Sequence, residues 1–93
     1  MQNRDSDHHF IYVIKNGNPA SVNSKKIWQE TEKYLQEKQI QYSVYNTEYA
    51  GHAKKIAEQI LKSHQEKTIL LIVGGDGTIH EVINGAASYP HAV

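Results

Sequence analysis

Short apolar runs alternate with longer amphipathic stretches along the chain. Residues 10–14 are apolar, β-branched or aromatic, and turn-forming residues 16–19 follow them, which predicts a strand and then a loop. Residues 40–46 alternate between apolar and polar side chains, which predicts a strand with one less buried face, near a sheet edge. Residues 68–73 are apolar after the first position, as expected for a strand that helices cover on both faces.

Each predicted strand is followed by residues with apolar side chains at helical spacing, and the opposite faces of these stretches are polar. Helices are therefore expected over residues 24–39, 53–64 and 79–87, with Trp28 and Tyr34 in the core. The apolar positions of the three helices are Ile27, Trp28, Thr31, Tyr34 and Leu35; Ala53, Ile56, Ala57, Ile60, Leu61 and His64; and Ile79, Val82, Ile83, Ala86 and Ala87.

The order β-α-β-α-β-α predicts an α/β fold, a three-layer Rossmann-like sandwich with a parallel sheet and right-handed crossovers. If the first strand lies between the second and third, the loops after the first and third strands leave the sheet on opposite faces. Open α/β sheets bind their ligands at such a point. The two loops rich in glycine or asparagine, at residues 16–20 and 74–78, are the ones that would meet there.

Length and composition narrow the class of protein. Ninety-three residues make one domain, expected over residues 10–93 behind a flexible polar leader at residues 1–9. Ten basic and ten acidic side chains give a formal net charge of zero, which argues against a nucleic-acid partner. No cysteine, no secretory signal and no apolar run of roughly 20 residues is present, so a cytoplasmic protein without a transmembrane segment is expected.

The sequence Gly74-Gly-Asp-Gly-Thr78 lies between the third strand and the third helix and carries the candidate chemistry. Glycines let a ligand approach main-chain N–H groups at a helix N-terminus, whose partial positive charge favours phosphate. A structural interpretation has about equal weight, because Thr78 and Glu81 match a capping box. Three roles are open for the Asp76 side chain: it accepts hydrogen bonds from loop amides, it holds Mg²⁺ that bridges to phosphates, or it forms an Asx turn.

Other sites are not supported by the spacing of residues. The P-loop pattern is absent, and His80 stands where the dinucleotide fingerprint needs its third glycine. The six histidines show no metal-ligand spacing, and no Ser-His-Asp or Cys-His set is present at usable spacing.

The run Gly74-Gly-Asp-Gly-Thr-Ile-His-Glu-Val-Ile-Asn-Gly85 resembles the signature of the diacylglycerol kinase catalytic domain family. Its first five residues are also shared with NAD kinases and, in varied form, with phosphofructokinases, whereas the extension at residues 81–85 favours the lipid kinases. Thr47-Glu-Tyr-Ala-Gly-His-Ala53 and the strand that runs into Asn16 resemble two further segments of the family. The loop after Asn16 lacks the family's late Ser-Gly.

By this resemblance, ATP with Mg²⁺ lies across the ends of the first and third strands, and Asp76 is the candidate metal ligand. The residues implied to line the nucleotide are Asn16, Gly17, Asn18, Pro19, Ala20, Thr47, Gly74, Gly75, Asp76, Gly77, Thr78, Ile79, His80 and Glu81.

The resemblance implies transfer of the γ-phosphate of ATP to a lipid hydroxyl, with a diacylglycerol-like acceptor. In the family the general base and part of the lipid site belong to a second, β-sandwich domain, so this chain is expected to be an N-terminal piece that is inactive alone. The implied partners are ATP and a lipid reached by peripheral membrane contact, and uncovered sheet edges make a homodimer an option. Two alternatives stay open: an NAD-kinase-like enzyme in which Asp76 activates the acceptor, and a non-catalytic nucleotide-binding or dimerising piece.

Overall fold

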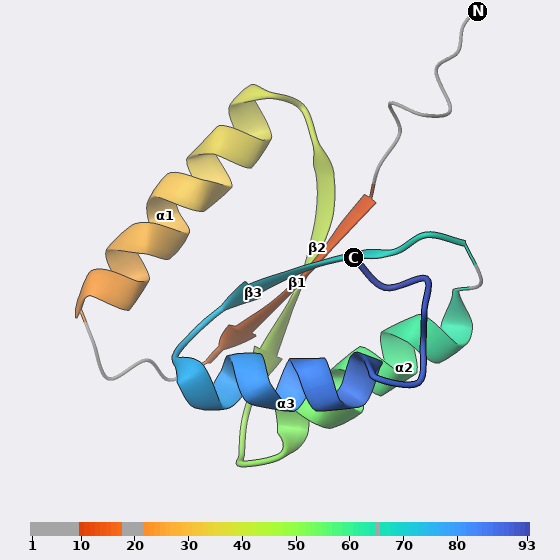
Figure 1. The fold of residues 1–93 in the computed structure, drawn as a ribbon. Coiled ribbons are helices and arrows are strands. Elements are labelled where there is room, and N and C mark those ends of the chain that lie inside the picture. The colour runs from red at the N-terminus through yellow and green to blue at the C-terminus, as the bar shows by residue number, and fades with distance from the viewer. Residues whose placement is uncertain (1–9, 18–21, 65) are drawn as a thin grey trace, which may run out of the picture.

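The computed structural model describes residues 10–17, 22–64 and 66–93, with side chains of the first helix described from Lys25 onward. The expected leader and the site candidates Asn18, Pro19 and Ala20 lie outside the described residues. Strands and helices alternate as the sequence predicts (Figure 1). The elements are β1 Phe10–Asn16, α1 Val22–Glu37, β2 Gln41–Thr47, α2 His52–Ser63, β3 Ile69–Val73 and α3 Asp76–Ala86.

The described strands form a parallel sheet in the order β2-β1-β3. This confirms that the first strand lies between the other two, and β2 is at an edge as its alternating pattern predicts. Helix α1 covers one face of the sheet, while α2 and α3 lie side by side on the other (Figure 1). The connections after β1 and β3 therefore leave toward opposite faces, and a hollow can form between them at the carboxyl ends of the strands.

The main core lies between the sheet and the α2–α3 pair. Its apolar side chains come from β1, from four positions along α2 and from one position on α3, and β3 contributes partly buried residues. The spacing predicted for α2 is confirmed at every aliphatic position. The buried members are Ile14, Ala53, Ile56, Ala57, Ile60 and Val82, with Tyr12, Leu70 and Ile72 packed against them.

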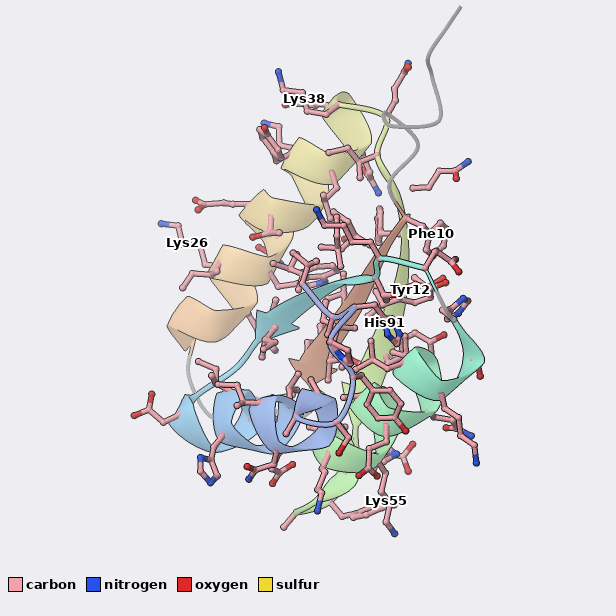
Figure 2. The ribbon with its side chains drawn as sticks, turned by 45° about the vertical axis from the view of Figure 1, so that its right-hand side comes forward. Phe10, Tyr12, Lys26, Lys38, Lys55 and His91 are labelled. Atoms are coloured by element: carbon pink, nitrogen blue, oxygen red, sulfur yellow. The ribbon has the colours of Figure 1, made fainter. Side chains whose placement is uncertain are left out.

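The face of the sheet that α1 covers is less well buried than the opposite face. Two sequence predictions are wrong here: that Ile27 and Tyr34 pack into the core, and that helices cover β3 on both faces. Leu35 is buried and Trp28 is half-buried with the Lys15 ammonium 5.9 Å from the centre of its ring, but Ile27 is 56% and Tyr34 is 55% exposed. Because α1 packs chiefly over β2, it leaves the outer part of the sheet open on this side. Strand β3 is consequently half-buried along its whole length instead of covered on both faces. Figure 2 shows that Lys26 on α1 and Lys38 just after its end project outward.

Several boundaries differ from the predicted ones for identifiable backbone reasons. Helix α1 ends at Glu37 because Gln39 takes a left-handed conformation (φ 57°) and the Ile40 N–H donates to the Leu35 carbonyl at 2.9 Å, closing the helix end. Strand β1 continues two residues beyond the apolar run, since Lys15 and Asn16 stay paired with Asn46 and Thr47.

The aromatic side chains of Phe10 and Tyr12 lie near the amino end of β1, at the opposite end of the strand from Asn16. The rings of Phe10 and Tyr12 are 5.0 Å apart (Figure 2), and the Tyr12 hydroxyl lies 2.9 Å from His64 Nε2. Burial, followed by the nearby Tyr45 and Glu66, raises the pKa of Tyr12. The phenol therefore keeps its proton, and its hydrogen bond with His64 ties β1 to the end of α2.

The last residues of the chain return to the sheet beside β3. The Thr68 N–H donates to the His91 carbonyl at 2.9 Å, and the Val93 N–H donates to the Thr68 carbonyl at 2.7 Å, in a parallel bridge. The Leu70 N–H donates to the Val93 carbonyl at 2.8 Å. The outer edge of β3 is thus already paired over its first residues. Within the described part of the chain, no helix has the length and apolar character to cross a bilayer.

Helices α2 and α3 approach each other closely at Gly85, which is buried. A Cβ at this position would lie 2.6 Å from the carbonyl oxygen of Lys54 and 3.2 Å from the Ala57 Cβ. The first of these contacts is with backbone, which cannot turn aside. Only glycine therefore allows this spacing between the two helices.

We expect Gly85→Ala to lower the free energy of unfolding by about 1–3 kcal/mol, because the added methyl group forces α2 and α3 apart. Urea denaturation followed by circular dichroism measures the change. The neighbouring Asn84→Ala, at an exposed position of the same helix, should change it by less than about 0.5 kcal/mol. Equal stability of Gly85→Ala and the parent chain would contradict the close packing.

Candidate functional site

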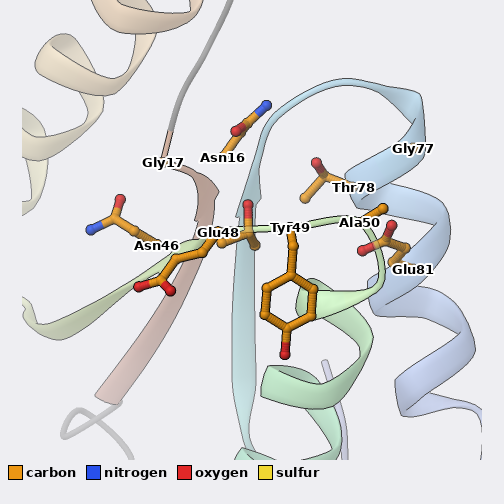
Figure 3. A pocket seen from close by; sticks show the side chains of 10 residues that line it. Asn16, Gly17, Asn46, Glu48, Tyr49, Ala50, Gly77, Thr78 and Glu81 are labelled. Atoms are coloured by element: carbon orange, nitrogen blue, oxygen red, sulfur yellow. The ribbon is translucent and has the colours of Figure 1, made fainter.

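A cavity of about 730 Å³ opens at the carboxyl ends of β1 and β2 and reaches the start of α3 (Figure 3). Asn16, at the end of β1, and Thr78 and Glu81, both on α3, project toward this common space (Figure 3). The cavity is where the strand order predicts a ligand site. The lining residues are Asn16, Gly17, Asn46, Thr47, Glu48, Tyr49, Ala50, Gly77, Thr78 and Glu81.

The floor of the cavity is made where β1 and β2 end together. The Gly17 N–H donates to the Thr47 carbonyl at 3.3 Å, and a Cβ on Gly17 would lie 2.7 Å from that same oxygen. Asn16 is paired in register with Thr47. The two strand ends, distant in the sequence, are thereby held at one edge, and the chain after β1 starts from a position that only glycine tolerates without a shift.

The first turn of α3 forms another side of the cavity. The sequence predicts a loop over residues 74–78, but part of this segment is helical. The helix starts at Asp76 instead of Ile79, since Gly75 is extended (φ −86°, ψ −173°) and its carbonyl accepts the Ile79 N–H at 3.1 Å. Asp76, Gly77 and Thr78 are therefore helical. Within the described part of the chain, their main-chain N–H groups have no acceptor, as expected for the opening amides of a helix without a side-chain cap.

The capping box predicted from Thr78 and Glu81 is wrong. Thr78 lies inside the helix, and Gly75 at the cap position provides no side chain. Glu81 reaches instead to α2: its Oε2 accepts the Gly51 N–H at 3.0 Å and its Oε1 accepts the Ala53 N–H at 3.2 Å. The spacing of Thr78 and Glu81 fits a capping box, but the cap position is set by the backbone at Gly75, three residues earlier than expected.

Two helix N-termini thus meet the cavity, and their charges differ. The start of α2 is compensated by the Glu81 carboxylate, whereas the start of α3 has open amides with the partial positive charge of a helix end. An anion that enters the cavity is drawn to α3 and away from Glu81. This asymmetry gives the site a polarity along which a phosphate chain can align.

The glycines at the start of α3 are not explained by packing within the protein. A Cβ on Gly74 would meet the Thr78 side chain at 2.9 Å, but a Cβ on Gly75 or Gly77 would find no described atom within 4 Å. Neither Gly75 nor Gly77 has a positive φ. Glycine weakens a helix relative to alanine, so residues with nothing to avoid inside the protein indicate that space is kept for something outside it.

The metal hypothesis rests on Asp76 alone. The described residues contain no group of three or more histidine, aspartate or glutamate side chains that could hold a metal ion. Asp76 is exposed, forms no ion pair with any described residue and lies in the first turn of α3. A single carboxylate does not fit an all-protein metal cage, but it would fit Mg²⁺ at a site where phosphates and water supply most of the ligands.

The structure brings together some of the residues predicted to line the site and leaves others outside. Of the predicted residues, six line the cavity and five others that are described do not. Four lining residues were not predicted, and all come from the end of β2 and the turn after it, a segment in which the family resemblance pointed to Thr47 alone. The six are Asn16, Gly17, Thr47, Gly77, Thr78 and Glu81; the five are Gly74, Gly75, Asp76, Ile79 and His80; the four are Asn46, Glu48, Tyr49 and Ala50.

Comparison with known proteins identifies the class. Residues 11–93 match the family described as "Diacylglycerol kinase catalytic domain", and the chain belongs to this family. It is 35% identical over 78 residues to "Putative lipid kinase YtlR" of Bacillus subtilis, covering 83% of this chain and 25% of that protein. It is 47% identical over 49 residues to a diacylglycerol kinase of Staphylococcus epidermidis, covering 53% of this chain and 15% of the relative.

A diacylglycerol kinase of Staphylococcus aureus is 43% identical over 49 residues, again 53% of this chain and 15% of the relative. The chain therefore spans about a quarter or less of the length of these curated relatives. The resemblance seen in the glycine-rich signature is confirmed at the level of the family.

We expect Thr78→Ala to change the free energy of unfolding by less than about 0.5 kcal/mol, because Thr78 does not cap α3. A helix-capping threonine would cost about 1 kcal/mol or more on the same substitution. Thermal and urea unfolding of the two chains decide between these values. A loss as large as that of a true cap would restore the capping box.

Proposed function

We propose that this chain is the ATP-binding portion of a cytoplasmic lipid kinase that transfers the γ-phosphate of ATP to a lipid hydroxyl, with a diacylglycerol-like acceptor. Membership of the diacylglycerol kinase catalytic domain family supports the reaction class. The cavity at the carboxyl ends of the parallel strands supports the nucleotide site.

The observation that carries the proposal is the start of α3. Open amides at Asp76, Gly77 and Thr78 coincide with glycines whose missing side chains leave free space, and Gly77 and Thr78 line the cavity. Phosphate oxygens that accept these N–H groups gain charge-assisted hydrogen bonds, each on the order of 1.5–3 kcal/mol. The β1 and β2 ends, at Asn16 and Thr47, then face the nucleoside side of the ligand.

Asp76 would hold Mg²⁺ in this scheme, beside the phosphates bound by the α3 amides. When bound, the ion supplies charge neutralisation between the phosphate oxygens. The chain's own residues bind and align the phosphates, and the asymmetry between the two helix ends orients them. Phosphoryl transfer depends on such positioning and needs little covalent chemistry from the protein. The acceptor and its general base would come from parts of the longer protein, since the relatives extend well beyond this chain.

The acceptor defines the remaining partners. A lipid hydroxyl is reached by peripheral contact with a membrane, and the formal net charge of zero means that this contact would not depend on general attraction to anionic lipids. Strand β2 is an edge strand, so a second copy could pair along it in a homodimer.

Gly77→Ala tests the phosphate site. The added methyl group meets no described atom and improves helix propensity, so the thermal midpoint without ligand should stay equal or rise. The same methyl group occupies the phosphate path, so the dissociation constant for ATP with Mg²⁺ should rise about tenfold or more, as expected for one lost charge-assisted hydrogen bond. Isothermal titration calorimetry measures the affinity.

Asn84→Ala is the matched control, since it raises helix propensity on the same helix outside the cavity and should leave ATP affinity unchanged. Absence of ATP binding by the parent chain, or equal affinity of Gly77→Ala, would contradict the phosphate assignment.

The chemical class of the phosphate acceptor can be tested with a longer protein that contains this chain. Given radiolabelled ATP, Mg²⁺ and diacylglycerol in detergent micelles, it should produce labelled phospholipid, whereas this chain alone should bind ATP and transfer nothing. Labelling of NAD⁺ in place of the lipid would overturn the lipid-kinase proposal and favour the NAD-kinase-like alternative.

A further inference from the structure

The turn between β2 and α2, residues 48–51, forms one wall of the cavity. Its hydrogen bonds and ring contact described next are with His52, the first residue of α2. The Glu48 N–H donates to His52 Nδ1 at 2.9 Å, and the His52 N–H donates to the Tyr49 carbonyl at 3.1 Å. The Tyr49 ring stacks on His52 at 4.4 Å with an interplanar angle of 9°, and it extends alongside α2 (Figure 3). These contacts shape the turn but do not fix its position relative to α3.

Glu81 supplies the link to α3. Both hydrogen bonds that join α3 to residues 51–53, within the described part of the chain, end on its carboxylate: Gly51 N–H to Oε2 and Ala53 N–H to Oε1. Gly51 is left-handed (φ 89°), a conformation that glycine adopts readily, and a Cβ there would meet no described atom. The glycine is needed for the backbone reversal that aims these amides at Glu81.

The two oxygens of Glu81 are therefore engaged by backbone donors while its side chain lines the cavity. A carboxylate repels a phosphate, and each oxygen of this one already accepts a backbone N–H. The family resemblance placed Glu81 around the phosphates, but its contacts assign it another task. It accepts two amides at the start of α2 and adds negative charge there, so that the open amides of α3 are the anion-binding helix end of the cavity.

We propose that Glu81 is a positioning residue of the nucleotide site, which holds the 48–51 turn against α3 and thereby sets the distance between opposite walls of the cavity. It acts through Gly51 and Ala53 and touches no atom of the nucleotide. This inference rests on the proposed ATP site. Its mechanical part, the hold on the turn, can be tested without ATP.

The test compares Glu81→Ala and Glu81→Gln with the parent chain. Glu81→Ala removes both acceptors, and we expect about tenfold weaker ATP binding by calorimetry, with an equal loss in the presence and absence of Mg²⁺. Glu81→Gln keeps one carbonyl acceptor and should fall between the two chains. Glu30→Gln, which removes an exposed carboxylate on α1, is the matched control and should bind ATP as the parent does.

Amide hydrogen exchange measured by NMR, with no ligand present, reports how firmly the 48–51 turn is held. The Gly51 and Ala53 amides should exchange at least tenfold faster in Glu81→Ala, whereas Ile60, in the buried part of α2, should keep its rate. Unchanged exchange at Gly51 and Ala53 would overturn the proposal. So would a loss of affinity that appears only with Mg²⁺, since that would make Glu81 a metal ligand.

The two proposals fail in different ways. If the parent chain binds no ATP, the nucleotide site is wrong and Glu81 positions nothing for it, although accelerated exchange would still establish the contact with the turn. If the parent chain binds ATP and Glu81→Ala binds it equally well while the turn is released, the nucleotide site stands and the positioning role is wrong.

Discussion

The contact between α2 and α3 is the constraint on which the site depends. Strands β2 and β3 lie on opposite sides of β1, so the turn after β2 and the turn after β3 start far apart at the edge of the sheet. They become opposite walls of one cavity because α2 and α3 pack side by side on one face, closely enough that Gly85 leaves no room for a methyl group. A wider spacing would separate the Gly51 amide from Glu81 and open the cavity.

The two helix N-termini that this packing brings to the cavity differ in charge. Each end has amides that the helix cannot use, and a single carboxylate accepts two amides at the start of α2, those of Gly51 and Ala53. If both ends were open, an anion would have two competing positions. If both were capped, the cavity would have no donor array. Capping one end from the other helix leaves a single preferred place for negative charge, and the same bond holds the walls together.

Much of the fold follows from local pattern. The apolar run before residue 74 and the aliphatic spacing in α2 predict elements that the structure contains, and glycines after two strands predict which sheet edge carries the site. Errors occur where tertiary contacts decide. Ile27 and Tyr34 follow helical spacing but are exposed because α1 sits over β2. The partner of Glu81 is 28 to 30 residues away in the chain, so local spacing pointed to the nearer Thr78.

The family signature at residues 74–85 separates into two functions along α3. Gly75 and Gly77 have open space beside them, and Gly77 lines the cavity, whereas Glu81, Val82 and Gly85 bond or pack against α2 and the core. The second group belongs to the extension at residues 81–85 that favours the lipid kinases over NAD kinases by sequence, whose other members, Ile83 and Asn84, are exposed. Since the three residues of the second group face α2 and not an acceptor, they identify how the two helices are joined and carry no information about which hydroxyl receives the phosphate. Choice of acceptor would therefore be encoded by residues other than these three.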